Sequence, residues 1–240
     1  MTGFLKGVAT AIITPFDENG INFHEFEKII EYQIVGGVDA IVVAGTTGEP
    51  ATMTEEEEGI LIGYAVKVVR GRIKVIAGTG SNSTKSAVEY STRAERLGAD
   101  GILAVTPYYN KCTQSGLFEY YKAIAESVSL PVICYNVPSR TGVNLLPATM
   151  ARLAEIPNIA GIKEASGNMA QVLETARLIR GKCDLYSGED ALNFPILAAG
   201  GTAVISVVSN LLPREVRELY TAVESGDLKR EAILNDRLVP

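Results

Sequence analysis

A chain of 240 residues, 47% hydrophobic and 21% charged, is long enough to bury a large core, either as one α/β barrel or as two ordinary domains. The formal net charge of −6 gives no general electrostatic reason to bind nucleic acid or an anionic membrane, and no apolar run approaches the roughly 18 residues of a membrane span. Three widely spaced cysteines (Cys112, Cys134 and Cys183) and the absence of a signal-peptide pattern at the N-terminus favour a reduced, cytoplasmic protein.

Eight short apolar segments with strand-like composition recur along the chain. Each ends in Gly, Thr, Ser, Pro or Asn, as a fully buried strand does where it enters a loop. In chain order they begin at Gly7, Asp39, Ile73, Gly101, Pro131, Ile159, Asp184 and Thr202. Their recurrence indicates repeated strand–helix units.

Helix-like segments separate these strands. Residues 22–35 place apolar side chains at spacings of three and four, which is the period of an amphipathic helix. The segment beginning at Thr54 opens on an N-cap residue followed by acidic residues in the first turn, which suits the helix dipole. Two later helices are predicted to end just before Gly98 and Gly181.

The last fifteen residues predict the start of one more helix, capped by Asp227. Its predicted apolar side consists of Leu228, Ile233, Leu234 and Leu238. Because nothing follows to cover this side, we expect either a shortened C-terminus or packing on a partner.

Eight strand–helix units in about 225 residues predict a closed (β/α)8 barrel. We expect the catalytic barrel to occupy residues 1–225 and the beginning of a C-terminal helical extension to occupy residues 226–240. A doubly wound open sheet is the structural alternative, although no segment has the Gly-x-Gly-x-x-Gly spacing of a dinucleotide site. In a barrel of this kind the functional groups lie at the C-terminal ends of the strands.

That rule singles out Lys163, in the segment "IAGIKEASG". Of the chain's ten lysines, it alone lies in the C-terminal half of a predicted strand, on the same face as Gly161 and Ala165. One interpretation is a lysine that extends to the barrel rim or pairs with an acid. The other is a partly desolvated amine whose lowered pKa makes it nucleophilic toward a carbonyl.

Other predicted strand ends carry polar or aromatic side chains. Tyr135 is either a core tyrosine or a proton-transfer group beside the lysine. Thr46 and Thr47, in "GTTGE", offer hydroxyls and backbone N–H groups to a small carboxylate, although a plain turn explains them equally well. Arg140 is either a clamp for a second carboxylate or an ordinary surface arginine. The aromatic pair at residues 108–109 suits either packing or chemistry.

The scarcity of histidine narrows the chemistry. His24 is the single histidine and lies on the first predicted helix, which excludes Ser-His-Asp and Cys-His catalysis and argues against a zinc-dependent aldolase. The pair Gly200–Gly201 precedes its strand and therefore does not form the phosphate cradle common in these barrels. What remains is lysine chemistry without a cofactor or metal: a Schiff base with an oxo-acid, followed by formation or cleavage of a carbon–carbon bond.

Five motifs together resemble the 4-hydroxy-tetrahydrodipicolinate synthase (dihydrodipicolinate synthase) family, within the N-acetylneuraminate lyase superfamily of Schiff-base aldolases. The motifs are "GTTGE", "VTPYYN", "YNVPSRTG", "GIKEASG" and "YSGED", in family order and at family spacing. The match runs from about Gly7 to the end of the chain. Agreement of several motifs along one chain makes the resemblance specific.

The resemblance implies a role for each candidate residue. Lys163 would form the Schiff base with pyruvate, and Tyr135 and Thr46 would belong to a proton relay. In the family a tyrosine from a neighbouring subunit completes this relay, and Tyr109 occupies that motif position. Thr47 and nearby backbone N–H groups would hold the pyruvate carboxylate.

The resemblance also implies the second substrate. Arg140 would receive the carboxylate of L-aspartate 4-semialdehyde, and Gly188 and Ile205 would line the pyruvate site. The product would be 4-hydroxy-tetrahydrodipicolinate, for diaminopimelate and lysine synthesis, made by a lyase that forms a homodimer or homotetramer.

Two alternatives stay open. A sugar-acid aldolase of the same superfamily shares the lysine, the tyrosine and the "GTTGE"-type loop but generally lacks the "PSRTG" arginine, because its aldehyde partner is a polyol. A catalytically impaired, truncated barrel is the other alternative, since family members usually continue past Pro240.

Overall fold

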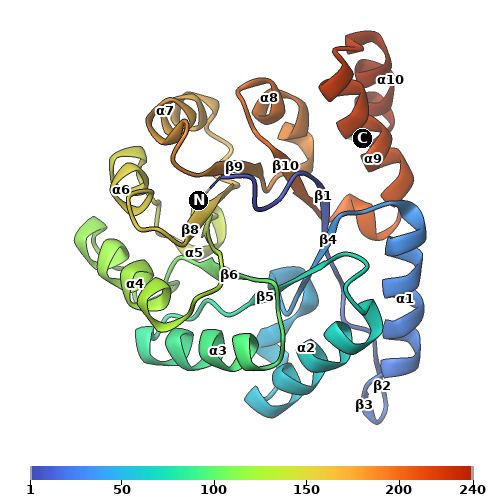
Figure 1. Ribbon diagram of the computed structural model, residues 1–240, viewed down its shortest axis with the longest axis vertical. Coiled ribbons are helices and arrows are strands. Elements are labelled where there is room, and N and C mark those ends of the chain that lie inside the picture. Colours follow the sequence, from blue (N-terminus) through green and yellow to red (C-terminus); the bar gives the residue numbers. More distant parts are fainter. Residues whose placement is uncertain (1, 239–240) are drawn as a thin grey trace.

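A closed barrel of parallel strands lies at the centre of the computed structural model, which describes residues 2–238 (Figure 1). Within that range the barrel strands are β1 (Gly7–Ala11), β4 (Ala40–Val43), β5 (Lys74–Gly78), β6 (Gly101–Val105), β7 (Val132–Asn136), β8 (Ile159–Glu164), β9 (Asp184–Ser187) and β10 (Ala203–Ser206). Neighbours along the chain are neighbours in the barrel, and β10 pairs in parallel with β1 to close it. The predicted (β/α)8 barrel is therefore confirmed, and the open-sheet alternative is wrong.

Helices surround the barrel on its outside (Figure 1). They are α1 (Phe23–Gly36), α2 (Glu55–Val69), α3 (Thr84–Arg96), α4 (Gln114–Ser127), α6 (Pro147–Leu153), α7 (Met169–Ile179), α8 (Asn193–Ala198), α9 (Pro213–Ser225) and α10 (Leu228–Leu238). Short pieces follow strands β4, β7, β9 and β10: η1 (Thr46–Gly48), η2 (Pro50–Thr52), α5 (Pro138–Thr141), η3 (Asp190–Leu192) and η4 (Val208–Asn210). A small antiparallel hairpin, β2 (Phe16–Asp17) and β3 (Gly20–Ile21), follows β1 and was not predicted from the sequence.

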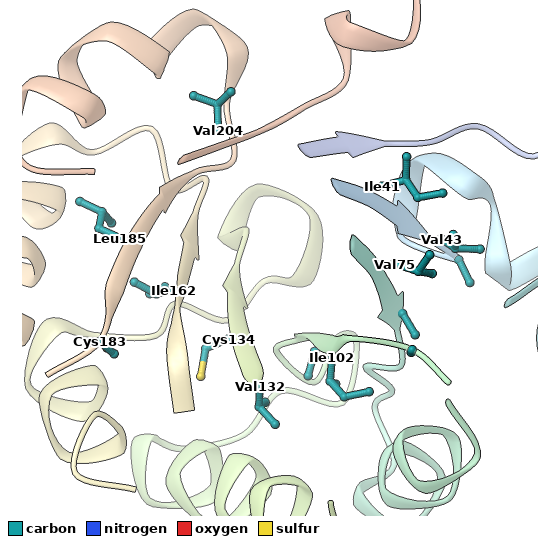
Figure 2. Close-up of a cluster of buried hydrophobic side chains, with 14 of the residues drawn as sticks. Ile41, Val43, Val75, Ile102, Val132, Cys134, Ile162, Cys183, Leu185 and Val204 are labelled. Atoms are coloured by element: carbon teal, nitrogen blue, oxygen red, sulfur yellow. The ribbon is translucent and has the colours of Figure 1, made fainter. Parts of the chain in front are cut away.

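The strands separate two hydrophobic clusters. Side chains such as Ile41, Ile102 and Ile162 belong to the larger cluster, between the strands and the helices (Figure 2). The alternate strand residues, among them Tyr135 and Ile205, belong to a smaller cluster inside the barrel. Burial of both faces explains why each strand reads as a nearly continuous apolar run.

Local sequence signals determine several helix ends. The Asn22 side chain accepts a hydrogen bond from Glu25 N at the start of α1. Thr54 and Glu57 form a reciprocal capping box at the start of α2. Gly98 and Gly181, with φ of +88° and +78°, follow α3 and α7 in the left-handed conformation that glycine adopts most readily.

Helix α10 corrects one expectation. Asp227 caps it as predicted, because its carboxylate accepts a hydrogen bond from Arg230 N at 3.0 Å. Leu234 and Leu238 are buried, but Leu228 and Ile233 are 59% and 55% exposed, so they do not belong to the buried side. The face that packs against α9 is determined by residues spaced three and four apart, and Glu231 takes the place expected for an apolar residue.

The domain boundary near residue 225 stays a prediction, and residues 1 and 239–240 of the two expected ranges lie outside the described residues. Between residues 2 and 238, no helix combines the length and the hydropathy that a membrane crossing requires. All three cysteines are free thiols.

Candidate active site

Lys163 and Tyr135 lie side by side inside the C-terminal end of the barrel. They are register partners on the adjacent strands β8 and β7, and both are buried. The Lys163 Nζ atom lies 4.2 Å from the centroid of the Tyr135 ring. Side chains alternate along a strand, so Lys163 shares a face with Ala165 and points into the barrel. Ala165 belongs to the cluster inside the barrel, whereas Ile162, on the other face, belongs to the outer cluster.

Burial determines the electrostatics of Lys163. The side chain is 4% exposed and forms no ion pair or hydrogen bond with any residue between 2 and 238. Desolvation lowers the pKa of Lys163 to about 8, against an opposing effect of the nearby Asp190 carboxylate, while the Arg140 charge lowers it further. Pairing with an acid therefore does not explain this lysine, and the amine is partly neutral near physiological pH.

Gly188 leaves the space that Lys163 occupies. A Cβ atom at this position would lie 2.8 Å from the lysine Cγ and 2.9 Å from its Cε, so any side chain here would displace the amine. The backbone N–H of Gly188 donates a hydrogen bond to the carbonyl of Glu164, which holds the residue after β9 against β8. Ile205, on the next strand, is buried inside the barrel.

A cavity of about 450 Å³ opens at this end of the barrel. Its lining includes Thr46, Tyr135 and Arg140, and it extends over Tyr108 to Glu58 on α2. Several expected site residues are not part of its lining: Thr47, Tyr109, Lys163, Gly188 and Ile205. Tyr135 therefore lies between the cavity and the lysine that is packed against its ring.

Arg140 presents an uncompensated positive charge to the cavity. It lies on the short helix α5 directly after β7, is exposed, and forms no ion pair with a described residue. Burial raises the pKa of the Tyr135 phenol, and the Arg140 charge acts in the opposite direction. A free guanidinium at a cavity wall is suited to an anionic group on a ligand.

The structure brings Thr46 to the cavity but not into a hydrogen-bonded chain with Tyr135. Thr46 and Thr47 belong to η1, and no hydrogen bond links either hydroxyl to another described side chain. Tyr109 is 91% exposed and lies outside the cavity lining, with a left-handed φ of +68°. The predicted relay is therefore not assembled within one chain.

Sequence reasoning gave two acidic residues near the site no role in catalysis or substrate binding. Asp190, within "YSGED", contributes the largest charge effect on Lys163, and the motif itself was the available signal. Glu58 lines the cavity, and its burial raises its pKa to about 7 despite the Arg93 guanidinium at 3.9 Å. Glu58 belongs to the acidic first turn of α2, which the sequence showed without indicating that it lines a cavity.

A closed (β/α)8 barrel with a desolvated lysine at the C-terminal ends of its strands has the features of a barrel lyase that works through a reactive amine. The family model described as "Dihydrodipicolinate synthetase family" matches residues 4–240, and the chain belongs to this family.

Relatives support the assignment along nearly the whole chain. The 4-hydroxy-tetrahydrodipicolinate synthase of Alkaliphilus oremlandii is 53% identical, over 94% of this chain and 78% of the relative. A crystal structure of the chloride-inhibited dihydrodipicolinate synthase from Acinetobacter baumannii with pyruvate is 44% identical, with a TM-score of 0.94 over 96% of this chain and 80% of that one. A solved dihydrodipicolinate synthase described as the first monomeric variant is 44% identical, with a TM-score of 0.96 over 99% and 80%.

Proposed function

We propose that this lyase condenses pyruvate with L-aspartate 4-semialdehyde to form 4-hydroxy-tetrahydrodipicolinate, in diaminopimelate and lysine biosynthesis. The observation that carries the proposal is the buried, unpaired Lys163, whose pKa is lowered to about 8 at the catalytic end of the barrel. Family membership supports the choice of substrates, because the relatives named above carry out this synthesis or bind pyruvate.

In the proposed mechanism the neutral Lys163 amine attacks the keto carbon of pyruvate. A carbon–nitrogen bond forms and the keto oxygen leaves as water, giving a protonated imine. Tyr135, whose ring contacts the amine, transfers protons to the departing oxygen and from the nitrogen. Thr46 takes part in this relay, and Thr47 with neighbouring backbone N–H groups binds the carboxylate.

Loss of a methyl proton then gives an enamine, which attacks the aldehyde carbon of the semialdehyde. The amino group of the semialdehyde next attacks the imine carbon, and the lysine amine leaves as the ring closes. Lys163 is thereby regenerated, so the condensation releases one water in total and requires no redox cofactor or metal.

Arg140 supports this reaction over a sugar-acid aldolase. Its exposed guanidinium lines the cavity without an ion pair to a described residue, and the semialdehyde supplies the carboxylate that such a group binds in bidentate fashion. A polyol aldehyde has no anionic group to offer at that position. Gly188 and Ile205 complete the proposed pyruvate site, Gly188 by leaving room for the lysine stem.

We propose a homo-oligomer, a dimer or tetramer, as the working form. The 91% exposure of Tyr109 supports this, because the side chain is available for contact with a neighbouring subunit. The free thiols and acidic charge balance support a cytoplasmic enzyme without a nucleic-acid or membrane partner.

Borohydride reduction in the presence of pyruvate tests the first step. We expect one pyruvate-derived adduct, which peptide mapping places on Lys163, and no adduct in K163R. The variant K74R changes a lysine at the opposite end of its strand and should label like the wild type. A folded wild-type protein that forms no adduct would refute the proposal.

A coupled assay then tests the aldehyde. Turnover with aspartate semialdehyde and not with sugar aldehydes is expected, and R140Q should lose at least tenfold in kcat/KM for the semialdehyde, as removal of a charged bidentate contact commonly does. Preference for a polyol aldehyde would instead identify the sugar-acid aldolase.

A further inference from the structure

The turn that carries Thr46 and Thr47 is held in an unfavourable backbone conformation. Ala44 and Glu49, at its two ends, have left-handed φ values of +54° and +57°. Non-glycine residues adopt this conformation at a cost in free energy, and it persists where the surroundings hold it. Contacts with the surrounding chain must therefore keep residues 44–49 in this conformation.

One contact is steric and comes from β5. A Cβ atom on Gly78 would lie 2.3 Å from the carbonyl oxygen of Ala44, so the backbone of this turn packs directly against a glycine. Two backbone hydrogen bonds close the turn internally, from Gly48 N to Gly45 O at 2.8 Å and from Glu49 N to Thr46 O at 3.2 Å. Neither the contact with Gly78 nor these two hydrogen bonds connects the turn to the segment that follows β1.

Thr14, in the segment after β1, supplies the connection between that segment and the turn. Its hydroxyl is buried and donates a hydrogen bond to the carbonyl oxygen of Gly48 at 2.7 Å. The fit is close, because a Cβ atom on Gly48 would lie 3.2 Å from both the Thr14 hydroxyl and the Ile12 carbonyl oxygen. Among the described residues, Thr14 is the one side chain from another strand's loop that hydrogen-bonds to this turn.

We propose that Thr14 is a positioning residue for the pyruvate carboxylate, acting through the buried hydrogen bond from its hydroxyl to the Gly48 carbonyl. This inference rests on the proposed function, in which Thr47 and the N–H groups of the turn bind that carboxylate. Without the hydroxyl, Gly48 keeps a buried carbonyl that lacks this partner, and residues 44–49 lose the contact that opposes their return to relaxed φ values. The turn then presents its donors in the wrong direction.

Loss of this hydrogen bond should affect the binding of pyruvate and not that of the semialdehyde. The semialdehyde is bound at Arg140, on the segment after β7, which the turn does not carry. Loss of the Thr14 hydroxyl should therefore weaken pyruvate binding and leave the KM for the semialdehyde unchanged. A threonine with a purely structural role would lower the Tm without separating the two substrates.

Three Thr14 variants and one control variant test this, with two measurements. T14V keeps the side-chain shape and removes the donor, T14S keeps the donor, and T14A provides the same test if T14V does not fold. The control is T175V: Thr175 is a buried threonine on α7 whose hydroxyl has no hydrogen-bond partner among the described residues. The readout is the pyruvate concentration that gives half-maximal borohydride trapping, with steady-state KM values for both substrates.

We expect half-saturation to rise about tenfold in T14V, as the loss of one buried hydrogen bond at a binding turn implies, and to stay within about twofold of wild type in T14S and T175V. An unchanged half-saturation in T14V, or an equal rise in both KM values, would overturn the role of Thr14 while the wild-type adduct still upholds the proposed function. Absence of an adduct in the wild type would overturn both.

Discussion

At Lys163 the proposed function conflicts with the stability of the fold. A cation that is 4% exposed and lacks an ion pair is disfavoured by desolvation, which lowers its pKa to about 8. At pH 7 this leaves about a tenth of the amine neutral, compared with fewer than about one in a thousand for an ordinary lysine. The nearby Asp190 carboxylate limits the shift, and in the proposed mechanism it would also compensate the positive charge of the iminium.

Replacing Lys163 with methionine should therefore stabilise the fold and abolish pyruvate trapping. Below pH 8 the amine is protonated in both states, and its burial costs the folded protein about 3 kcal/mol, given a pKa of about 8 against 10.5. Between those values the unfolded chain binds the proton more tightly, so wild-type stability rises with pH. We expect K163M to be more stable than wild type by a few kcal/mol at pH 7 and by much less at pH 10, measured by urea unfolding.

An equal gain in stability at both pH values would show that packing, and not the charge, causes the difference in stability between wild type and K163M. The same outcome would contradict the assignment of a lowered pKa to Lys163.

At the scale of elements, helix α2 begins with a signal that lies in its own local sequence. Helix α2 follows the turn at residues 44–49 and starts with the capping box of Thr54 and Glu57. The Thr54 N–H donates to the Glu57 carboxylate at 2.7 Å, and the Glu57 N–H donates to the Thr54 hydroxyl at 3.2 Å. Both contacts are local and lie on the exposed side of the helix.

Replacing Thr54 with alanine should accordingly affect stability and not substrate binding. We expect T54A to lose about 1 kcal/mol of unfolding free energy, because it leaves helix N–H groups without their cap. Its half-saturation by pyruvate should match that of the wild type. T92A is the control, since the Thr92 hydroxyl bonds only to carbonyls of its own helix and its loss should be nearly neutral. A large rise in half-saturation for T54A would mean that α2, and not Thr14, holds the turn.

At the scale of the whole molecule, the barrel brings together groups from strands far apart in the chain but leaves Tyr109 outside. This tyrosine is 91% exposed and does not line the cavity, so the proposed relay is complete only if another subunit supplies its Tyr109. Association is thus part of the proposed mechanism, in addition to any effect it has on stability.

Mixing two inactive variants tests this requirement. Y109F keeps Lys163, and K163R keeps Tyr109, so a hybrid dimer contains one complete site if Tyr109 acts across the interface. After mixed refolding, about a quarter of wild-type activity should return, because half of randomly formed dimers are hybrids with one working site of two. The separately refolded variants should stay inactive. No recovery in a mixture shown to contain hybrids would mean that Tyr109 acts within its own chain or not at all.

Much of the architecture followed from local patterns. Strand-like runs ending in small or polar residues, helix caps such as Thr54, and glycines such as Gly98 indicated the elements correctly, because these signals depend on neighbours within one or two turns. The β2–β3 hairpin and the orientation of α10 were missed, because two-residue strands leave no periodic pattern and the rotation of α10 is determined by α9.

The sequence by itself determined the order of strand–helix units, the closed barrel that this order favours and the unusual place of Lys163 in a strand. Only the tertiary structure decided what surrounds that lysine: the ring of Tyr135, the space beside Gly188 and the hydrogen bond from Thr14 to Gly48. The physical reason is range. Strand and helix preferences arise between residues a few positions apart, whereas desolvation and steric fit come from atoms on different strands that meet only when the barrel closes.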